Sequence, residues 1–305
     1  MPGTLIFSDA HIGSRTAPSL LERPAAVEAL CRALGEVDRL VILGDLLELR
    51  ERRPAAEVLA VATPALGALA GAVGEIVLVP GNHDRPLITP WIRARGDALE
   101  LEEEVPAAAT PLLGAVVDAL GAGGARVSVR YPGVRLSPRA WATHGHYLDV
   151  VLAPEGPHGL RPRPAPDRPA AYERTRERGG VDSPLHRIQA RVLSPGLAPL
   201  TTRVLELQLR RRGVPALARA LEALGVSAEH VIFGHLHRLG PTAPDAPRHW
   251  QRQLAPGTLP TRFLNTGSWV LDELLVGRGG RRHAYWPGGV VRIGDDGIPR
   301  ADRLF

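Results

Sequence analysis

Short β-rich apolar runs alternate with longer segments of helical spacing in the first part of the chain. Three runs have the length and branched composition of buried strands: Thr4–Ser8, Arg39–Leu43 and Glu75–Val79. Between them, Pro24–Leu34 and Ala55–Ala72 have the apolar spacing of helices. The order β-α-β-α-β, with connections of this length, predicts neighbouring parallel strands joined by right-handed crossovers. We therefore expect an α/β fold.

Later apolar runs extend this pattern. Trp141–Thr143 and Val231–Phe233 have the composition of buried strands. Near the end of the sequence, His283–Trp286 and Val290–Ile293 predict a β-hairpin around Pro287-Gly288-Gly289. Strands from distant parts of the chain are thus expected in the fold.

Each of the five buried runs leads directly into side chains that can bind metal ions. These are Asp9 and His11 after the first run, Asp45 after the second, Asn82, His83 and Asp84 after the third, His144 and His146 after the fourth, and His235 and His237 after the fifth. In open α/β sheets, ligands bind outside the carboxyl ends of the strands. Taken singly, each block is typical of a turn or a helix cap. Five such blocks in order favour a metal site.

The types of side chain indicate which ions could bind. A mixture of carboxylates and imidazoles suits Mn, Fe or Zn, whereas an oxygen-only set would suit Mg or Ca. Asp9 and His11 are two residues apart, so in an extended segment they point to the same side, where both can bind one ion. His235 and His237 repeat this spacing. Because the ligands exceed what one ion needs, we predict two divalent ions that share a bridging carboxylate, with manganese favoured.

In this order, the five blocks resemble the calcineurin-like metallophosphoesterase superfamily. The blocks are Asp9-x-His11, Gly44-Asp45, Gly81-Asn82-His83-Asp84, His144-Gly145-His146 and Gly234-His235-x-His237. The match extends from residue 4 to about residue 270. The resemblance implies an α/β/β/α sandwich, in which two facing mixed sheets are flanked by helices, and a dinuclear metal centre at the strand ends.

The resemblance also implies a role for each matching residue. Asp9, His11 and His237 would hold the first ion, Asp45 would bridge the two ions, and Asn82, His144 and His235 would complete the second site. His83 would lie near the leaving group with Asp84 orienting it, and His146 would contact the substrate.

Two segments are similar to one branch of this superfamily, which contains bacterial UDP-2,3-diacylglucosamine pyrophosphatases. They are Leu46-Leu47-Glu48 after the second block and Asn265–Trp269 after a late strand. That branch has Arg where this chain has His83, and Asp where it has His146. In this chain, Arg85, which directly follows Gly81-Asn82-His83-Asp84, could bind a phosphate.

These implications predict a metal-dependent phosphoric ester hydrolase. Two ions ~3.5 to 4 Å apart clamp a phosphoryl group and lower the pKa of a bridging water toward ~7, so hydroxide attacks at neutral pH. The negative charges of Asp9, Asp45 and this hydroxide offset all but about one of the positive charges of the two ions. The centre is therefore expected to attract an anionic substrate. We expect a phosphoester or pyrophosphate that is small or lipid-linked. The alternatives are a nuclease and a catalytically inactive scaffold of the same fold.

A basic segment separates the fourth and fifth blocks. Between residues 161 and 212, twelve arginines face five carboxylates, a balance of +7, whereas the whole chain carries +5. Helical spacing recurs at Ala170–Arg178, Pro184–Leu193 and Leu200–Arg212. The segment could form a cap that gathers an anionic substrate, contact an anionic membrane surface, bind nucleic acid, or be a solvated helical excursion. Binding of nucleic acid is less favoured because Tyr172 is the only aromatic residue in this segment, and single-strand binding favours several.

The predicted ligands extend from residue 9 to residue 237, so a cut into two domains would divide the site. We predict one domain over residues 1–305 with an insertion at 151–212. The composition, 44% hydrophobic and 23% charged, is that of a soluble globular protein. Leu5–Phe7 leads to Asp9 without the basic and apolar regions of a signal peptide. We expect a cytoplasmic protein, with peripheral membrane contact through the insertion as an alternative, and find no signal for an oligomer interface.

The single cysteine, Cys31, lies in an apolar helical pattern. A small core residue is therefore expected there, and no disulfide can form within the chain, which fits a reducing compartment.

Overall fold

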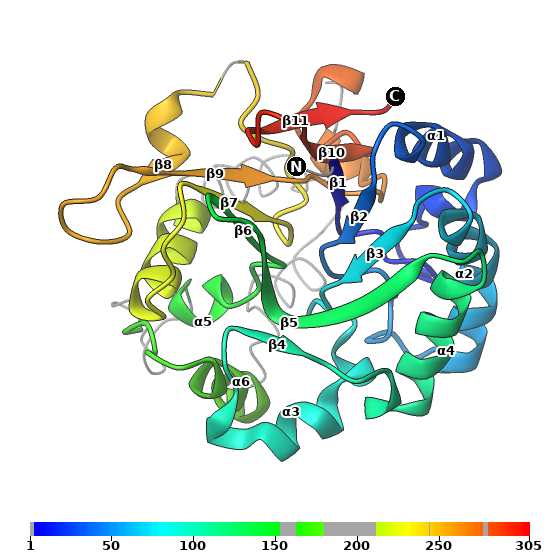
Figure 1. The fold of residues 1–305 in the computed structure, drawn as a ribbon, viewed down its shortest axis with the longest axis horizontal. Helices are drawn as coiled ribbons and strands as arrows, with labels where there is room; N and C mark the ends of the chain where they lie inside the picture. The colour runs from blue at the N-terminus through cyan, green and yellow to red at the C-terminus, as the bar shows by residue number, and fades with distance from the viewer. Residues whose placement is uncertain (1–2, 153–162, 180–211, 244, 277–279) are drawn as a thin grey trace.

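The computed structural model describes residues 3–152, 163–179, 212–243, 245–276 and 280–305 (Figure 1). Within them, eleven strands form one curled mixed sheet in the order β11-β10-β1-β2-β3-β5-β6-β7-β9-β8, and β4 pairs with β5 beside this path. The predicted α/β class is thus confirmed. The strands are β1 (Thr4–Phe7), β2 (Arg39–Ile42), β3 (Glu75–Leu78), β4 (Glu102–Glu104), β5 (Arg126–Ser137), β6 (Ala140–Thr143), β7 (His230–Phe233), β8 (Gln251–Arg252), β9 (Thr261–Asn265), β10 (Gly289–Ile293) and β11 (Pro299–Arg303).

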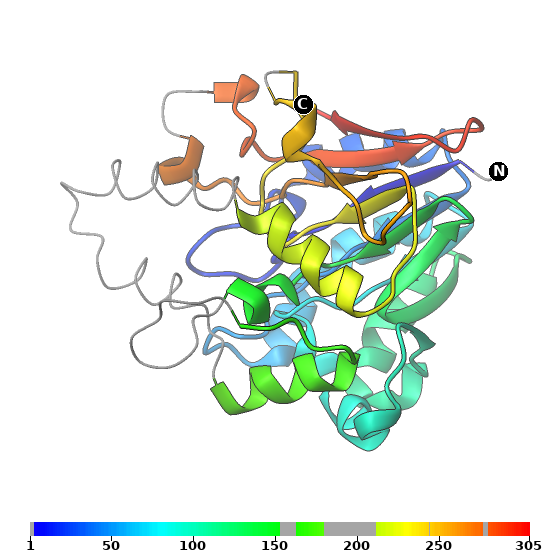
Figure 2. The same cartoon turned by 90° about the vertical axis from the view of Figure 1, so that its left-hand side faces the viewer.

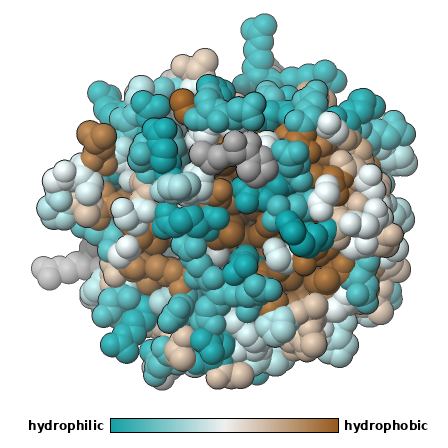
Figure 3. Space-filling model, viewed as in Figure 1, coloured by the Kyte–Doolittle hydropathy of each residue, from teal (hydrophilic) through white to brown (hydrophobic). Residues whose placement is uncertain are grey.

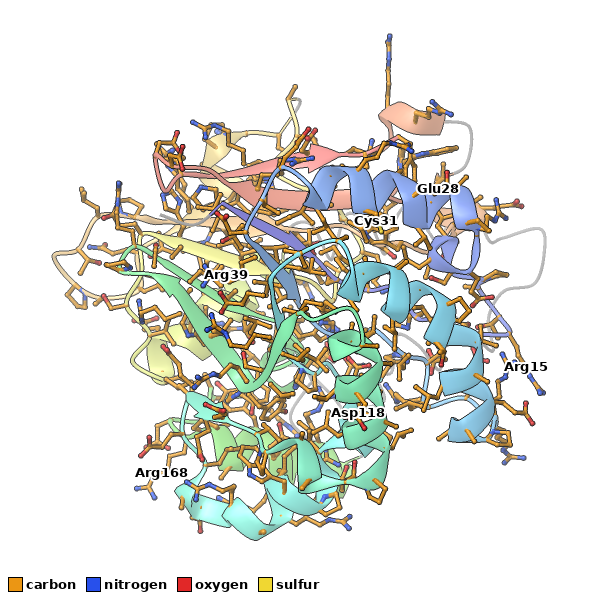
Figure 4. All side chains as sticks on the ribbon, turned by 45° about the vertical axis from the view of Figure 1, so that its right-hand side comes forward. Arg15, Glu28, Cys31, Arg39, Asp118 and Arg168 are labelled. Carbon is orange, nitrogen blue, oxygen red and sulfur yellow. The ribbon has the colours of Figure 1, made fainter. Side chains whose placement is uncertain are left out.

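Helices lie on the outer sides of the curled sheet (Figure 1). The helices in the described part of the chain are α1 (Pro24–Leu34), α2 (Ala55–Ala70), α3 (Thr89–Arg95), α4 (Pro111–Gly121), α5 (Leu148–Leu152), α6 (Pro169–Gly179), a helix over residues 212–223, and α9 (Glu273–Val276). α1, α2 and α4 share an apolar cluster with β1, β2 and β3, whereas the helix at 212–223 shares one with β6, β7 and β9. Cys31, on α1, is half-buried and its Sγ lies 3.6 Å from the carbonyl oxygen of Ala68 on α2 (Figure 4).

The five elements predicted for the first part of the chain are confirmed, each within two residues of its expected end. β1, β2 and β3 are neighbouring parallel strands, in which Leu5 pairs with Leu40 and Leu40 pairs with Ile76. Pro24 fits the first turn of α1 because the N–H that it lacks has no partner within a helix there. Because the pairing of the three strands is in register, they end at the same level. In Figure 2, β1 runs from the N label toward the side on which α5 lies.

The long strand β5 curls the sheet onto itself. Its first part pairs in parallel with β3, and its last part pairs antiparallel with β6. Side chains from both parts of the sheet, among them Ile6, Val77 and Ile232, meet in one apolar cluster. The central strands are thus covered on both faces. Hydrogen bonds through β5 join the two parts into one curled sheet, and the sandwich of two facing sheets stays a prediction.

The predicted late hairpin is wrong in its first strand. His283–Trp286 forms turns, and β10 pairs antiparallel with β11 instead. The connection contains Gly297 with φ of 69°, a left-handed backbone that glycine adopts without steric cost. Asp296-Gly297 is thus the turn signal, and β11 (Pro-Arg-Ala-Asp-Arg) has no apolar pattern that would predict a strand, because it is mostly polar.

The predicted insertion is described only in part. Its first expected helix is α6, whereas the expected helices at 184–193 and 200–212 lie outside the described residues apart from residue 212. No helix of the described residues combines the length and apolar character of a membrane span. On the face shown in Figure 3, hydrophilic residues lie between apolar patches. Contact of the insertion with a membrane or nucleic acid stays a prediction.

Candidate metal centre

Backbone hydrogen bonds hold together the loops that follow β1 and β2. The N–H of Asp9 donates to the carbonyl oxygen of Gly44 at 2.9 Å, and the N–H of His11 donates to that of Asp45 at 2.8 Å. The two loops thus continue side by side from the carboxyl ends of neighbouring strands. This pairing brings the first two predicted ligand blocks to one edge of the sheet.

All the non-glycine residues with positive φ in the described chain are predicted metal ligands. They are Asp9 (54°), His11 (46°), Asp45 (52°), His235 (67°) and His237 (55°). This left-handed backbone is disfavoured for residues with a Cβ and persists where the surroundings impose it, which is commonest at functional sites. The expectation that Asp9 and His11 lie in an extended segment is therefore corrected. Their side chains converge in a left-handed loop.

Three overlapping groups of side chains could each hold a metal ion. They are Asp9, His11 and His237; His11, Asp45 and His83; and Asp45, His144 and His235, and the ligand atoms of each group lie within 4.8 Å of one another. The first and third groups correspond to the two ligand sets that the resemblance implies. Because His11 and Asp45 each belong to two groups, the side chains form one continuous centre.

Distances between the donor atoms fit shared metal ions. His237 Nε2 lies 3.2 Å from His11 Nε2 and 3.3 Å from Asp9 Oδ1. On the other side, His144 Nε2 lies 3.2 Å from Asp45 Oδ2. Ligands at about 2.0 to 2.1 Å around a tetrahedral ion are separated by about 3.3 Å. The residues present therefore fit the metal ions predicted from the sequence.

Oxygen atoms around the centre fix the orientation of its imidazoles. His144 Nδ1 donates to the carbonyl oxygen of Leu43 at 3.0 Å, so its Nε2 faces Asn82 Oδ1 at 3.1 Å. His235 Nε2 lies 2.9 Å from Asp149 Oδ1. Metal-binding histidines usually give their second ring nitrogen to a carbonyl or carboxylate, which fixes the tautomer. Asp149, on α5, belongs to none of the predicted blocks and was missed.

Glu48 links a predicted ligand to the predicted catalytic histidine. Its side chain is buried, and Oε2 lies 3.1 Å from His11 Nδ1 and 2.6 Å from His83 Nδ1. Burial opposes ionisation of this carboxyl group, but its hydrogen bonds with the two imidazoles outweigh burial and hold its pKa well below the usual range. In the sequence, Glu48 stood out only as part of Leu46-Leu47-Glu48, one of the two segments that are similar to one branch of the superfamily. Its two partners follow from the fold.

The charges at the centre depend on one another. Burial opposes protonation of His144, yet the carboxylate of Asp45 raises the pKa of His144 to about 9. Burial likewise opposes ionisation of Asp45, but the charges of His144 and His83 hold its pKa well below the usual range. A metal ion must displace the protons of such imidazoles in order to bind. Metal binding and protonation are thus competing ways to balance the buried carboxylates.

Two glycines allow the close approach of these groups. A Cβ on Gly81 would clash with Asp45 Oδ1, and a Cβ on Gly44 would clash with the imidazole of His144. Gly44 also has φ of 89°, which favours glycine. The glycines of the second and third blocks are therefore required by packing against the ligands.

The segment at residues 265–269 forms hydrogen bonds with Asp9. The N–H of Trp269 and the hydroxyl of Ser268 both donate to the carbonyl oxygen of Asp9 at 3.0 Å. Thr266 Oγ1 lies 2.5 Å from Ser8 Oγ, which also contacts Asp9 Oδ2. This segment thus fixes both the backbone and the carboxylate of Asp9.

The structure corrects the role that the resemblance implies for Asp84. The carboxylate of Asp84 does not contact the ring of His83 but accepts hydrogen bonds from three backbone N–H groups. These belong to Leu46, Leu47 and Gly81, at 3.1, 2.8 and 3.0 Å. Burial raises the pKa of Asp84 to about 6 despite these bonds. Asp84 therefore holds two loops together, and Glu48 is the residue that orients His83.

Replacement of Asp84 by alanine is expected to lower the free energy of unfolding by about 3 kcal/mol or more. Three buried N–H groups would lose their acceptor, at about 1 to 3 kcal/mol each. Denaturant unfolding of the metal-free protein measures the change. The control is Asp118→Ala, at an exposed position on α4 (Figure 4), which should cost less than about 0.5 kcal/mol. Similar small losses in both variants would contradict this role.

The two predicted substrate contacts are paired with protein groups. Arg85 Nε lies 3.2 Å from Glu173 Oε2, and Arg85 Nη2 lies 3.1 Å from Glu177 Oε1. His146 is buried with Nε2 3.3 Å from Tyr131 Oη, and burial lowers the pKa of His146 to about 3. The phosphate contact of Arg85 stays a prediction. The substrate contact of His146 stays a prediction.

Comparisons with known proteins do not place the chain in a family. No protein-family model and no curated protein matches it. Among solved structures, a phosphopantetheinyl hydrolase from Mycobacterium tuberculosis is similar with 16% identity and a TM-score of 0.37, over 93% of this chain and 94% of that one. A cold-active protein-tyrosine phosphatase from a psychrophilic Shewanella species is similar with 12% identity and a TM-score of 0.32, over 99% and 80% of the two chains. Similarities of this strength carry no argument about function.

Proposed function

We propose that this chain is a metal-dependent phosphoric ester hydrolase of the calcineurin-like metallophosphoesterase superfamily. The observation that carries the proposal is the set of three ligand groups joined through His11 and Asp45. Carboxylate, imidazole and amide donors at these distances suit Mn, Fe or Zn. The apolar cluster between the two parts of the curled sheet supports the α/β/β/α sandwich of that superfamily.

Two divalent ions at this centre, with manganese favoured, would polarise a phosphoryl group and supply hydroxide at neutral pH. In this proposal the first ion would be held by Asp9, His11 and His237, the second by Asn82, His144 and His235, and both by Asp45. Glu48 and Asp149 keep the imidazoles of His11 and His235 in orientation. The protein would thus contribute the whole set of donors for both ions.

His83 is the residue placed to move a proton in the proposed reaction. Its ring packs edge-on against His11 with centroids 4.5 Å apart, and its Nδ1 is held by Glu48. Burial lowers the pKa of His83, and the carboxylates of Asp45 and Glu48 oppose this shift. An anionic substrate would oppose it further, which favours the imidazolium that can donate to the leaving oxygen. The proposed substrate is a phosphoester or pyrophosphate, small or lipid-linked.

The proposal is tested by hydrolysis after reconstitution with manganese. The substrates are a phosphomonoester, a phosphodiester, a nucleotide-sugar pyrophosphate and single-stranded DNA. We expect turnover of one of the first three that stops when a chelator removes the metal. Preferred cleavage of DNA would favour a nuclease. If the protein binds manganese and turns over none of the four, the hydrolase proposal is rejected in favour of an inactive scaffold.

A further inference from the structure

A cavity lies at the end of the curled sheet that is opposite to the metal centre. It measures about 290 Å³, which is close to the smallest pockets that bind ligands in proteins, at about 300 Å³. Its charged and polar lining residues are Arg39, Glu75, Glu102, Ser128, Arg130 and Arg135. Arg39 and Glu75 are the first residues of β2 and β3, whereas the predicted metal ligands follow the carboxyl ends of these strands. The cavity is therefore separate from the metal centre.

The cavity lies between the two parts of the curled sheet. Ser128 belongs to the part of β5 that pairs with β3, and Arg135 belongs to the part that pairs with β6. The guanidinium of Arg39, which is labelled in Figure 4, connects the two parts. Its Nη2 donates to Thr4 Oγ1 on β1 and to the carbonyl oxygen of Leu136 on β5, both at 3.1 Å. These bonds hold Arg39 in a defined position at the cavity.

The other charged lining residues are neutralised by ion pairs. These pairs are Glu75 with Arg126, Glu102 with Arg135, and Arg130 with Glu104, with distances between nitrogen and oxygen of 3.5, 3.5 and 3.0 Å. Each pair contains one positive and one negative side chain, so together they contribute no net charge. The charge that is left over at the cavity is that of Arg39.

Arg39 has only neutral hydrogen-bond partners among the described residues. Its Nε and Nη2 donate to a hydroxyl and a carbonyl oxygen, whereas its Nη1 donates to none of these residues. The side chain is half-buried, and burial lowers the pKa of its guanidinium, which the charge of Glu75 only partly opposes. A buried charge is stabilised by an ionic partner, and the planar fork of a guanidinium suits the oxygen atoms of a carboxylate or phosphate.

We propose that this cavity binds a small oxyanion, either a phosphate or a carboxylate, through Arg39 and Ser128. The anion would accept a hydrogen bond from Arg39 Nη1 and balance its charge, and the hydroxyl of Ser128 would donate a second bond. A ligand that binds only the folded chain stabilises it, so a bound anion would strengthen the connection between the two parts of the sheet. This site needs neither metal ions nor the proposed hydrolysis.

Calorimetry with inorganic phosphate and with succinate tests the proposal. Each anion is titrated into the manganese-loaded protein and into the same protein after a chelator has removed the metal, because phosphate can also bind manganese. One of the two anions is expected to bind both forms with a Kd of about 1 mM or tighter. Phosphate alone would identify a phosphate site, and succinate alone a carboxylate site. The proposal is overturned if neither anion binds the metal-free protein.

Two variants locate the binding in the cavity. Arg39→Gln is expected to weaken the affinity about tenfold or more, the effect of losing a charge-assisted hydrogen bond. Ser128→Leu should have a similar effect, because it fills the cavity and leaves the bonds of Arg39 to Thr4 and Leu136 in place. The control is Arg300→Gln, at an exposed arginine that pairs with Asp296 on the outer strand β11. Unchanged affinity in either cavity variant would overturn the proposal, and Ser128→Leu decides alone if Arg39→Gln does not fold.

Discussion

Asp45→Asn is expected to lower kcat on the preferred substrate by about 10³-fold or more and to reduce the manganese bound by the purified protein. Asp45 is the carboxylate that belongs to two of the three ligand groups, and its Oδ2 lies 3.2 Å from His144 Nε2. Removal of its charge weakens both proposed ion sites, and metal ions supply several kcal/mol of transition-state stabilisation, at about 1.4 kcal/mol for each tenfold in rate.

Asparagine is the informative substitution because it keeps the local hydrogen bond. Asp45 Oδ1 accepts from the backbone N–H of His83 at 2.7 Å, and an amide oxygen can accept the same bond. Thermal unfolding of the metal-free protein should therefore remain cooperative. Asp118→Asn, on the outer helix α4, is the control for loss of one carboxylate and should keep both activity and metal content. Full activity in Asp45→Asn would exclude Asp45 as the bridging ligand.

His83→Gln is expected to lower kcat by about 10² to 10⁴-fold on a substrate with an alkyl leaving group, and by less than about tenfold on a p-nitrophenyl ester. A poor leaving group needs a proton as its bond to phosphorus breaks, whereas nitrophenolate leaves without one. Steady-state kinetics on both substrates, with metal content measured in parallel, tests this role.

The same comparison decides between two roles for His83. Its ring nitrogen lies within 4.8 Å of ligand atoms of His11 and Asp45, so His83 could also hold a metal ion. A ligand role predicts equal losses on both substrates together with reduced metal content. His249→Gln is the control, since His249 lies in a short 3-10 helix at Pro247–His249 outside the three ligand groups. A normal rate on the alkyl substrate would exclude both roles.

The first five elements and the placement of ligands at strand ends could be predicted from the sequence alone. Apolar spacing and strand-forming composition are properties of one segment, so β1, α1, β2, α2 and β3 appear within two residues of their expected ends. Neighbouring parallel strands end at the same level, so the residues that follow them, such as Asp9 and Asp45, lie close together. This proximity could be predicted from the order of the strands alone. The polar strand β11 shows the limit of this approach, because it has no apolar pattern to detect.

Only the tertiary structure decided which polar groups support those ligands. The sequence placed Asp84 beside His83, yet the ring partner of His83 is Glu48, 35 residues away. Arg85 likewise pairs with Glu173, 88 residues later, and Asp149 with His235, 86 residues apart. A carboxylate accepts from any donor that packing brings within about 3 Å. The sequence therefore determined the chemistry at each strand end, whereas the packing of distant segments decided which carboxylate each imidazole and arginine contacts.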